Sequence, residues 1–235
     1  MSRLAWDTAG EKRYETGIDH CVLYPSKMLD RKVSYPNGVA WNGITSISES
    51  PDGADAEDFY ADNIKYLSLR GVENFGGSIS AYMYPEEFAV CDGSAEFDES
   101  LPGVHLHQQT RQMFGLSYRT IDGNDINPEA SYKYHIIYGA TASPSDKEYA
   151  TVNDSPEPIE FSWDFDTTPT PVEGFPKLKP VSLITIDERK LNASQVKALQ
   201  DVLWGTDDGS SMSPTNARLP LPAELFKILS EAKDS

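Results

Sequence analysis

The stretch "PIEFSWDFDTT", residues 158–168, alternates between apolar and polar side chains without interruption. Successive side chains of a β-strand point to opposite faces, so this pattern predicts a strand with one face in the protein core. The predicted core face consists of Ile159, Phe161, Trp163 and Phe165. The opposite face carries the carboxylates of Glu160, Asp164 and Asp166 and no cation to balance them. What this acidic face looks out upon is the first functional question.

Segments rich in β-branched and aromatic residues recur along the chain, separated by turn-forming stretches such as "SPDGADAED" and "DGNDINPEAS". Besides 159–166, we expect strands at 43–49, 63–69, 77–84, 103–109, 113–121, 132–140 and 180–187. Many short strands joined by polar turns are typical of a β-sandwich or barrel. The sequence therefore predicts a mainly β fold.

One helix is well signalled, in "LNASQVKALQDVLWGT". Asn192 followed three residues later by Gln195 matches a capping box, and Gly205 is suited to end the helix. The predicted helix 192–204 presents Val196, Leu199 and Leu203 as an apolar stripe that packs on the sandwich. We expect one domain over 1–205, then a flexible link and C-terminal extension over 206–235, with a weaker helix after Pro222.

Composition limits the function classes. The chain has 235 residues and a formal net charge of -17, which opposes nucleic-acid binding through phosphate contacts. No apolar run approaches the length of a spanning helix, and the N-terminus has no apolar signal-peptide region, so we expect neither membrane association nor export. In a reducing compartment, Cys21 and Cys91 are expected to be buried free thiols.

The sequence offers few candidates for catalysis or for metal binding. His105 and His107 share a face of an expected strand, but two ligands do not make a metal site. The sequence contains no G-x-S-x-G, Walker A or H-E-x-x-H motif. We expect no enzyme activity and no cofactor. A hydrolase that uses a pair of carboxylates remains an alternative, because carboxylates are abundant.

The segment "SESPDGADAEDFYAD", residues 48–62, is unusually long and acidic for a connection between two strands. It contains no cation and holds six carboxylates, those of Glu49, Asp52, Asp55, Glu57, Asp58 and Asp62. Two interpretations remain open at this point, a solvated loop and a functional loop.

Several stretches together resemble the major tail tube proteins of long-tailed, non-contractile bacteriophages, especially those of Gram-positive hosts. The resemblance runs in order over most of the chain, with 170–217 the least similar part. The stretches are "WDTAGEKRYETGIDHCVLYP" (6–25), "YPNGVAWNGITSISESPDGADAEDFYADNIKYLSL" (35–69), "AYMYPEEFAVCDGS" (81–94), "QTRQMFGLSYRTIDGND" (109–125), "YKYHIIYGATASPSDKEYATVNDSPEPIEFSWDFDTTP" (132–169) and "RLPLPAEL" (218–225).

The resemblance implies a β-sandwich subunit that assembles with itself into hexameric rings, stacked as a tube through which DNA leaves the virion without specific binding. It implies a virion tail component, assembled in the bacterial host cytoplasm, with the tail tip, terminator and tape measure proteins as further partners. It also implies a long hairpin loop that reaches the neighbouring ring. The expected inter-ring contact residues are Asp52, Asp55, Glu57, Asp58, Phe59 and Tyr60.

The acidic face of 158–168 then has two interpretations, an outer solvated surface or the lining of the tube's lumen. An acidic lumen would repel DNA mildly and let it slide. The alternative function is a receptor- or carbohydrate-binding β-sandwich of a phage tail tip. Such a module needs exposed aromatic side chains in a concave site, and the candidates are Trp41, Tyr60, Tyr82 and Tyr84.

Overall fold

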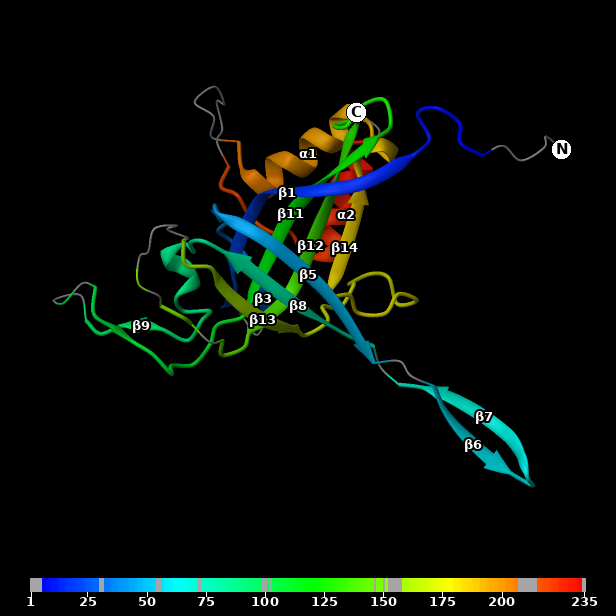
Figure 1. Ribbon diagram of the computed structural model, residues 1–235, viewed down its shortest axis with the longest axis horizontal. Helices are drawn as coiled ribbons and strands as arrows, with labels where there is room; N and C mark the ends of the chain where they lie inside the picture. Colours follow the sequence, from blue (N-terminus) through cyan, green and yellow to red (C-terminus); the bar gives the residue numbers. More distant parts are fainter. Residues whose placement is uncertain are drawn as a thin grey trace.

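The computed structural model describes residues 6–29, 32–53, 56–71, 73–98, 101, 103–145, 147–149, 151, 158–206 and 215–233. The fold is mainly β, which confirms the predicted class (Figure 1). The strands are β1 (Arg13–Pro25), β2 (Lys27–Leu29), β3 (Lys32–Ser34), β4 (Val39–Ala40), β5 (Ile44–Gly53), β6 (Ala56–Ala61), β7 (Ile64–Arg70), β8 (Glu73–Ala81), β9 (Ala95–Glu96), β10 (His105–Leu106), β11 (Phe114–Asn124), β12 (Ser131–Ala142), β13 (Phe161–Thr167) and β14 (Leu183–Asp187). The helices are α1 (Ala193–Trp204), α2 (Pro222–Glu231) and the 3-10 turns η1 (Glu86–Phe88) and η2 (Glu188–Lys190).

The main sheet is antiparallel and has the strand order β4-β1-β11-β12-β13-β8-β5, with β14 paired to β12 off this path. Strand β12 pairs with two strands along one edge, with β14 over Lys133–Ile137 and with β13 over Ala140–Ala142. Gly139 lies between these segments with a φ of 66°, and a Cβ there would come within 2.2 Å of the Thr168 carbonyl oxygen. Only glycine suits this junction, where the sheet divides.

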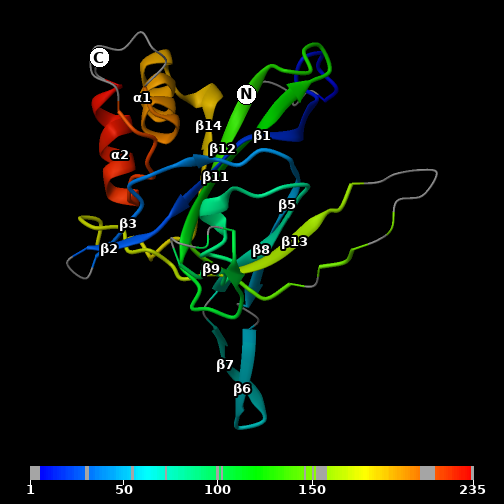
Figure 2. The same ribbon diagram turned by 90° about the vertical axis from the view of Figure 1, so that its left-hand side faces the viewer.

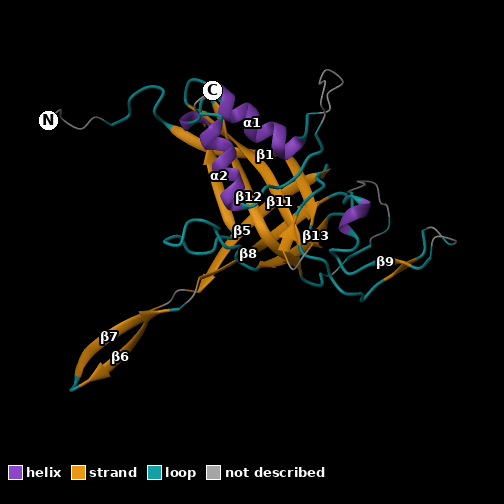
Figure 3. Ribbon diagram, turned by 180° about the vertical axis from the view of Figure 1, so that it is seen from behind, coloured by secondary structure: helices purple, strands orange, loops and turns teal. Residues whose placement is uncertain are grey.

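The molecule has three layers (Figure 2). Strands β1, β11, β12 and β14 form the middle layer, β13, β8 and β5 cross it on one side, and α1 and α2 cover it on the other (Figure 3). The first core, between the two strand layers, is centred on fully buried Trp163, Phe88 and Phe114, whose rings pack edge to face. It also encloses Cys21 and Cys91 as free thiols, as expected.

The second core lies between the middle layer and the helices. Tyr24, Tyr134 and Tyr138 from the strands meet Leu199 and Leu203 from α1 there. Burial raises the pKa of the Tyr24 hydroxyl well above its usual range, so this group stays protonated and donates its hydrogen bond to the Leu203 carbonyl. The helices are thus fixed to the layer opposite to the one that carries β13.

Helix α1 begins where the sequence predicts. The Asn192 side chain accepts from the Gln195 backbone, and the Gln195 side chain accepts from the Asn192 backbone. Leu199 and Leu203 are buried, but Val196 is only half-buried and lies outside the second core. Gln195 is buried in its place, because its amide donates a 2.8 Å hydrogen bond to the Leu229 carbonyl of α2. The buried face of α1 therefore includes Gln195 rather than Val196, because α2 packs beside it.

The C-terminal segment 215–233 belongs to the folded unit rather than extending beyond it. Leu219 and Leu225 are buried in the second core, and the Tyr138 hydroxyl donates a 2.9 Å hydrogen bond to the Pro220 carbonyl. Helix α2 follows Pro222 as expected. Of the expected link, residues 207–214 lie outside the described residues.

Strand β1 is a long strand that the sequence pattern did not predict. Its pairing with β11 shifts register twice, between Thr16 and Ile18 and between Asp19 and Val22. Gly17 and His20 have positive φ values of 63° and 48° at these irregularities. Bulges interrupt the alternation of side chains, so the periodicity that identifies a strand is lost at the sequence level.

Candidate functional site

The outer face of β13, β8 and β5 is a continuous polar surface that neither the middle layer nor the helices cover. Trp163 and Phe165 of β13 point into the first core, so the alternate residues of this strand point outward. Paired residues of neighbouring strands share a face, which gives three rungs across the layer. The rungs are Ser162–Ser80–Ser46, Asp164–Ser78–Ser48 and Asp166–Gly76–Ser50, and these nine residues are called the polar sheet face.

The predicted acidic residues lie on or beside this face. Asp164 and Asp166 are exposed, with no ion pair among the described residues. Glu160 precedes β13 and accepts a hydrogen bond from the Thr45 hydroxyl. Ile159, expected in the core, also lies outside the strand and is 38% exposed, because pairing with β8 starts only at Phe161. The alternating strand is therefore present, but it begins at Phe161, two residues later than the pattern predicts.

The polar sheet face carries negative charge without compensation. None of the residues of β5, β8 and β13 is Lys or Arg. At one end, an open groove of about 620 Å³ runs between Asp52, Asp164 and Asp166 over the backbone of Gly76. The outward side chains of the three rungs are short, so the polar sheet face is smooth as well as acidic. It offers no deep cavity that would enclose a small ligand.

The segment expected to be a long loop is instead mostly strand. Residues 50–53 prolong β5, which pairs with β8 as far as Gly53 and Glu73, and Ala56–Ala61 form β6. Strands β6 and β7 make a separate hairpin that projects from the body (Figure 1). Asp62 and Asn63 at its tip have φ values of 53° and 62°, the left-handed pair that tight hairpin turns require. We call residues 56–70 the arm.

The arm has one polar and one apolar face. Asp58 bonds to Ser68 at 2.6 Å and to Lys65 at 2.7 Å, which places these three side chains on the same face. These bonds, above all the one from Lys65, lower the pKa of Asp58. The neighbouring pairs, Phe59 with Leu67 and Glu57 with Leu69, point the other way. The apolar face of the arm therefore carries Phe59, Leu67, Leu69 and, opposite Ala61, Ile64, with the Glu57 carboxylate beside Leu69 as its one charged group.

The expected contact residues divide between different environments. Phe59 lies on the apolar face of the arm, whereas Tyr60 and Asp58 lie toward the polar face. The Asp52 carboxylate, in β5, accepts a 2.7 Å hydrogen bond from the Gly53 backbone. Glu57 is exposed, and Asp55 lies outside the described residues. The expected set of contact residues, drawn from 48–62, omitted Ile64, Leu67 and Leu69. The apolar residues of "NIKYLSL" in the neighbouring predicted strand could have identified them.

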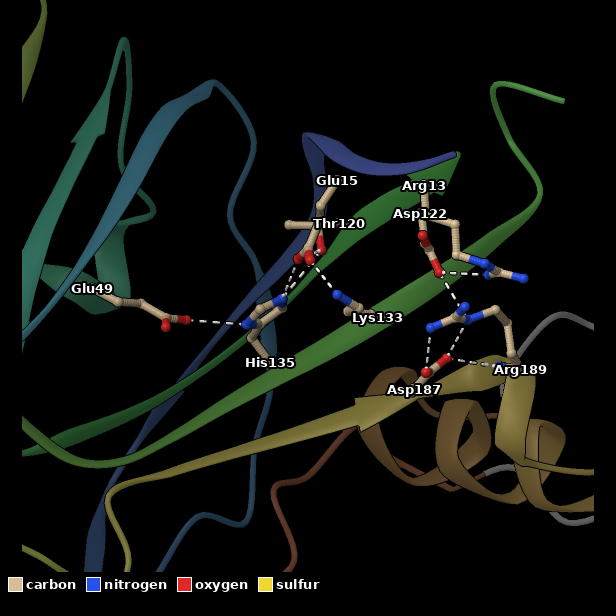
Figure 4. A network of polar contacts seen from close by, with 9 residues as sticks. All are labelled: Arg13, Glu15, Glu49, Thr120, Asp122, Lys133, His135, Asp187 and Arg189. Carbon is tan, nitrogen blue, oxygen red and sulfur yellow. Dashed lines mark hydrogen bonds and ion pairs between the residues drawn. The ribbon is translucent and has the colours of Figure 1, made fainter. Parts of the chain in front are cut away.

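A polar cluster joins β5 to the middle layer (Figure 4). The Glu49 carboxylate points inward and accepts hydrogen bonds from the Tyr118 hydroxyl at 2.5 Å and from His135 Nδ1 at 3.0 Å. The other ring nitrogen of His135 lies 3.3 Å from the Glu15 carboxylate. This carboxylate also accepts hydrogen bonds from Lys133 and Thr120. We call these six residues the polar clamp. A second network beside it joins Arg13, Asp122, Arg189 and Asp187.

The clamp shifts the acidity of both carboxyl groups. The hydrogen bond from His135, aided by Tyr118 and opposed by burial, lowers the pKa of Glu49. Burial raises the pKa of Glu15, but the bonds from Lys133 and Thr120 outweigh it, so the net shift is downward. Both groups are therefore held as carboxylates at neutral pH.

The other candidate sites are not assembled. His105 lies in β10, while His107 Nδ1 is 2.8 Å from the Ser94 hydroxyl, and the described residues contain no cluster of three potential metal ligands. Trp41 is buried and Tyr84 packs against the first core, so they form no exposed platform with Tyr60 and Tyr82. Neither α1 nor α2, the helices of the described part, has the length and apolar character to cross a bilayer.

Comparisons with known proteins give distant likenesses only. No protein-family model and no curated protein matches this chain. A chain of the anti-feeding prophage (AFP) baseplate is 8% identical with a TM-score of 0.36, and the match covers 78% of this chain and 97% of that one. A chain of the sheath-tube complex of an extracellular contractile injection system is 10% identical with a TM-score of 0.32, covering 72% and 88%. TM-scores of this size do not establish a common fold.

Proposed function

We propose that this chain is a structural subunit of a phage-type tail that assembles with itself into hexameric rings stacked as a tube. The tube is the conduit for DNA, and the role is structural rather than catalytic. The ordered resemblance to tail tube proteins over most of the chain supports this role. The proposed location is the virion tail, assembled in the host cytoplasm, with the tail tip, terminator and tape measure proteins as further partners.

The observation that carries the proposal is the polar sheet face. It presents short serine and glycine residues with Asp164 and Asp166, and its three strands contain no Lys or Arg. A DNA conduit needs such a surface, because cations would bind phosphates in every ring while mild repulsion lets the polymer move. The helices lie on the opposite side of the molecule, where they leave this face clear to line a lumen (Figure 2).

The arm supplies a contact between rings. A two-stranded hairpin with its apolar side chains in water is marginally stable alone. A partner that covers the exposed apolar face of Phe59, Ile64, Leu67 and Leu69 would stabilise it. A second copy in the next ring meets this requirement in every ring of a stack. Because the contact joins different surfaces of two copies, it extends in one direction without closing.

Negative-stain electron microscopy of the purified chain tests the proposal. Tubes or stacked rings are the expected result, either spontaneously or after addition of tail tips that nucleate growth. A reconstruction of the assembled tube then gives the direction of Asp164 and Asp166. Dispersed monomers under both conditions would instead favour the receptor- or carbohydrate-binding module, and a lumen lined by another layer would contradict the assigned face.

A further inference from the structure

A second hairpin projects from the body and, like the arm, has an apolar face. Strands β9 and β10 pair Ala95 with Leu106, and the Phe97 backbone extends this pairing by donating a 2.9 Å hydrogen bond to the Val104 carbonyl. Alternate rungs of a hairpin point to opposite sides, so Phe97, Val104 and Leu106 share one face. These three side chains are 44–57% exposed. We call the strands β9 and β10 the short hairpin.

The short hairpin and the arm lie at opposite ends of the molecule. In Figure 1, whose horizontal direction is the longest axis, β9 lies at the left and β6 and β7 lie at the lower right. The view from behind shows the same separation (Figure 3). The arm therefore cannot cover the short hairpin of its own copy. The two apolar faces can meet only between copies, head to tail.

Arg111 lies at the base of the short hairpin without an acceptor. A Cβ on Gly93 would come within 3.3 Å of Arg111 Cζ, so the guanidinium packs over this glycine. The Gln109 backbone donates a 2.9 Å hydrogen bond to the Gly93 carbonyl, which closes the base of the hairpin. Arg111 Nε is buried with no hydrogen-bond partner among the described residues, and Arg111 forms no ion pair with any of them. Buried donors in native proteins are nearly always satisfied, so an anionic group from a partner would complete this site.

The tip of the arm carries an anionic group of this kind. Asp62 and Asn63 form the turn between β6 and β7, and Asp62 is exposed. Within the described part of the chain, Asp62 takes part in no ion pair. Ile64, which follows the turn, is 64% exposed on the apolar face of the arm. The arm therefore ends in an unpaired carboxylate next to apolar side chains.

We propose that the apolar face of the arm of one copy docks on the apolar face of the short hairpin of the next copy, with Asp62 paired to Arg111. The two elements point away from each other within one copy, so in a head-to-tail contact they run antiparallel (Figure 1). The tip of the arm then meets the base of the short hairpin, where the surrounding apolar side chains exclude water from the ion pair. This inference rests on the proposed function, because it names the surface that receives the arm.

Charge and coverage favour this contact over contacts between like hairpins. Two arms docked antiparallel, face to face, would bring Asp62 of each copy toward Glu57 of the other, and like charges repel. Such a pair would also leave Arg111 without an anionic partner. A contact between like hairpins covers only one of the two apolar faces of each chain, whereas a contact between the arm and the short hairpin covers both.

Disulfide cross-linking between singly substituted full-length chains tests the contact. The native thiols of Cys21 and Cys91 are buried and do not compete. Leu67→Cys chains are mixed with Val104→Cys chains at high concentration and oxidised, and the mixed dimer is identified by its mass. We expect several-fold more mixed dimer than from Leu67→Cys with His105→Cys, because His105 lies on the opposite face of the short hairpin.

A charge exchange tests the ion pair. Arg111→Glu in the Val104→Cys chain should lower the yield of mixed dimer about fivefold, the factor that one ion pair supplies, and Asp62→Lys in the Leu67→Cys chain should restore it. Glu57→Lys is the matched control, because it makes the same change of charge at the base of the arm and should not restore the yield. Restoration by Glu57→Lys instead of Asp62→Lys would contradict the antiparallel contact.

Thermal unfolding shows whether each variant is folded. Should Arg111→Glu not fold, Asp62→Asn carries the same test from the arm, since Asn suits the left-handed backbone of this turn and leaves the buried arginine in place. It should lower the yield by a similar factor. An unchanged yield with folded Asp62→Asn would exclude the ion pair.

Electron microscopy of the unsubstituted chain separates this inference from the proposed function. Tubes together with equal cross-linking of the Val104→Cys and His105→Cys mixtures refute the contact and leave the proposed function standing. Selective cross-linking without tubes contradicts the tube and leaves the head-to-tail contact standing. Dimers that form mainly between two Leu67→Cys chains show that arms pair with arms, which also refutes the contact.

Discussion

The Tyr24 hydroxyl donates a 2.8 Å hydrogen bond to the backbone carbonyl of Leu203 and thereby joins β1 to the last turn of α1. The last carbonyls of a helix have no partner within it, and this one is buried, so the bond replaces water that cannot reach it. The Ser117 hydroxyl lies 3.0 Å from the same oxygen of Tyr24. The contact ties the second core to the helix end by polar as well as apolar forces.

We therefore expect Tyr24→Phe to lower the free energy of unfolding by about 1–3 kcal/mol, because it leaves the Leu203 carbonyl buried without a donor. Urea unfolding followed by tryptophan fluorescence measures this change. Tyr14→Phe is the matched control, since Tyr14 is 46% exposed and should change the stability by less than about 0.5 kcal/mol. Equal effects of the two substitutions would contradict the role of the buried bond.

Leu199→Ala should destabilise the fold by about 2–5 kcal/mol, because Leu199 is fully buried between α1 and the middle layer. Val196→Ala on the same helix should cost clearly less, since Val196 is half-buried and outside the second core. Urea unfolding of both variants gives the comparison. A larger loss at Val196 than at Leu199 would mean that α1 packs in a different rotation.

The apolar face of the arm should control tube growth but not folding. Leu67→Ser is expected to leave the thermal midpoint of the subunit nearly unchanged and to abolish or strongly shorten tubes, because it places a polar group in the proposed contact. Tyr60→Ser changes the polar face of the same hairpin and should still give long tubes. Tube length distributions from electron microscopy decide between them, and normal tubes from Leu67→Ser would exclude this face as the contact.

Changing Glu160, Asp164 and Asp166 together to Lys should leave a folded subunit that still forms tubes, because all three side chains are exposed. Release of DNA through such tubes should slow or stall at low salt and recover as salt screens the phosphate attraction. The charge-matched control changes the exposed Glu86, Glu87 and Glu129 to Lys. The same slowing in the control would show that total charge, rather than the polar sheet face, governs release.

Acid should weaken the polar clamp. The pKa of Glu49 is lowered in the folded chain from its ordinary value of 4.5, so its contribution to stability is present above that value and is lost as the pH falls through the folded pKa. Glu49→Gln should therefore be less stable than the wild type at neutral pH, and its stability should fall less steeply below about pH 4.5. Urea midpoints across this range measure both effects, with Glu57→Gln as a control that should follow the wild type.

Local signals in the sequence were sufficient for the elements that local forces decide. The alternation of Phe161 to Asp166 fixed which side chains of β13 share a face, because a strand has a period of two wherever it lies. The capping box of Asn192 and Gln195 set the start of α1, because its hydrogen bonds join residues only three apart. The mainly β class and the second helix after Pro222 could also be predicted, because strand composition and a proline at a helix start are local signals too.

The tertiary structure alone decided how these elements face one another. The two bulges of β1 and the pairing of β6 with β7 depend on partner strands, so the pattern of each segment alone could not predict them. The polar clamp joins Glu15, Glu49 and His135, which are far apart along the chain. An alternating pattern shows that the two faces of a strand differ, but not what covers each face. Packing of the whole chain buried Trp163 and placed the helices on the far side of the middle layer. Asp164 was therefore left open to solvent.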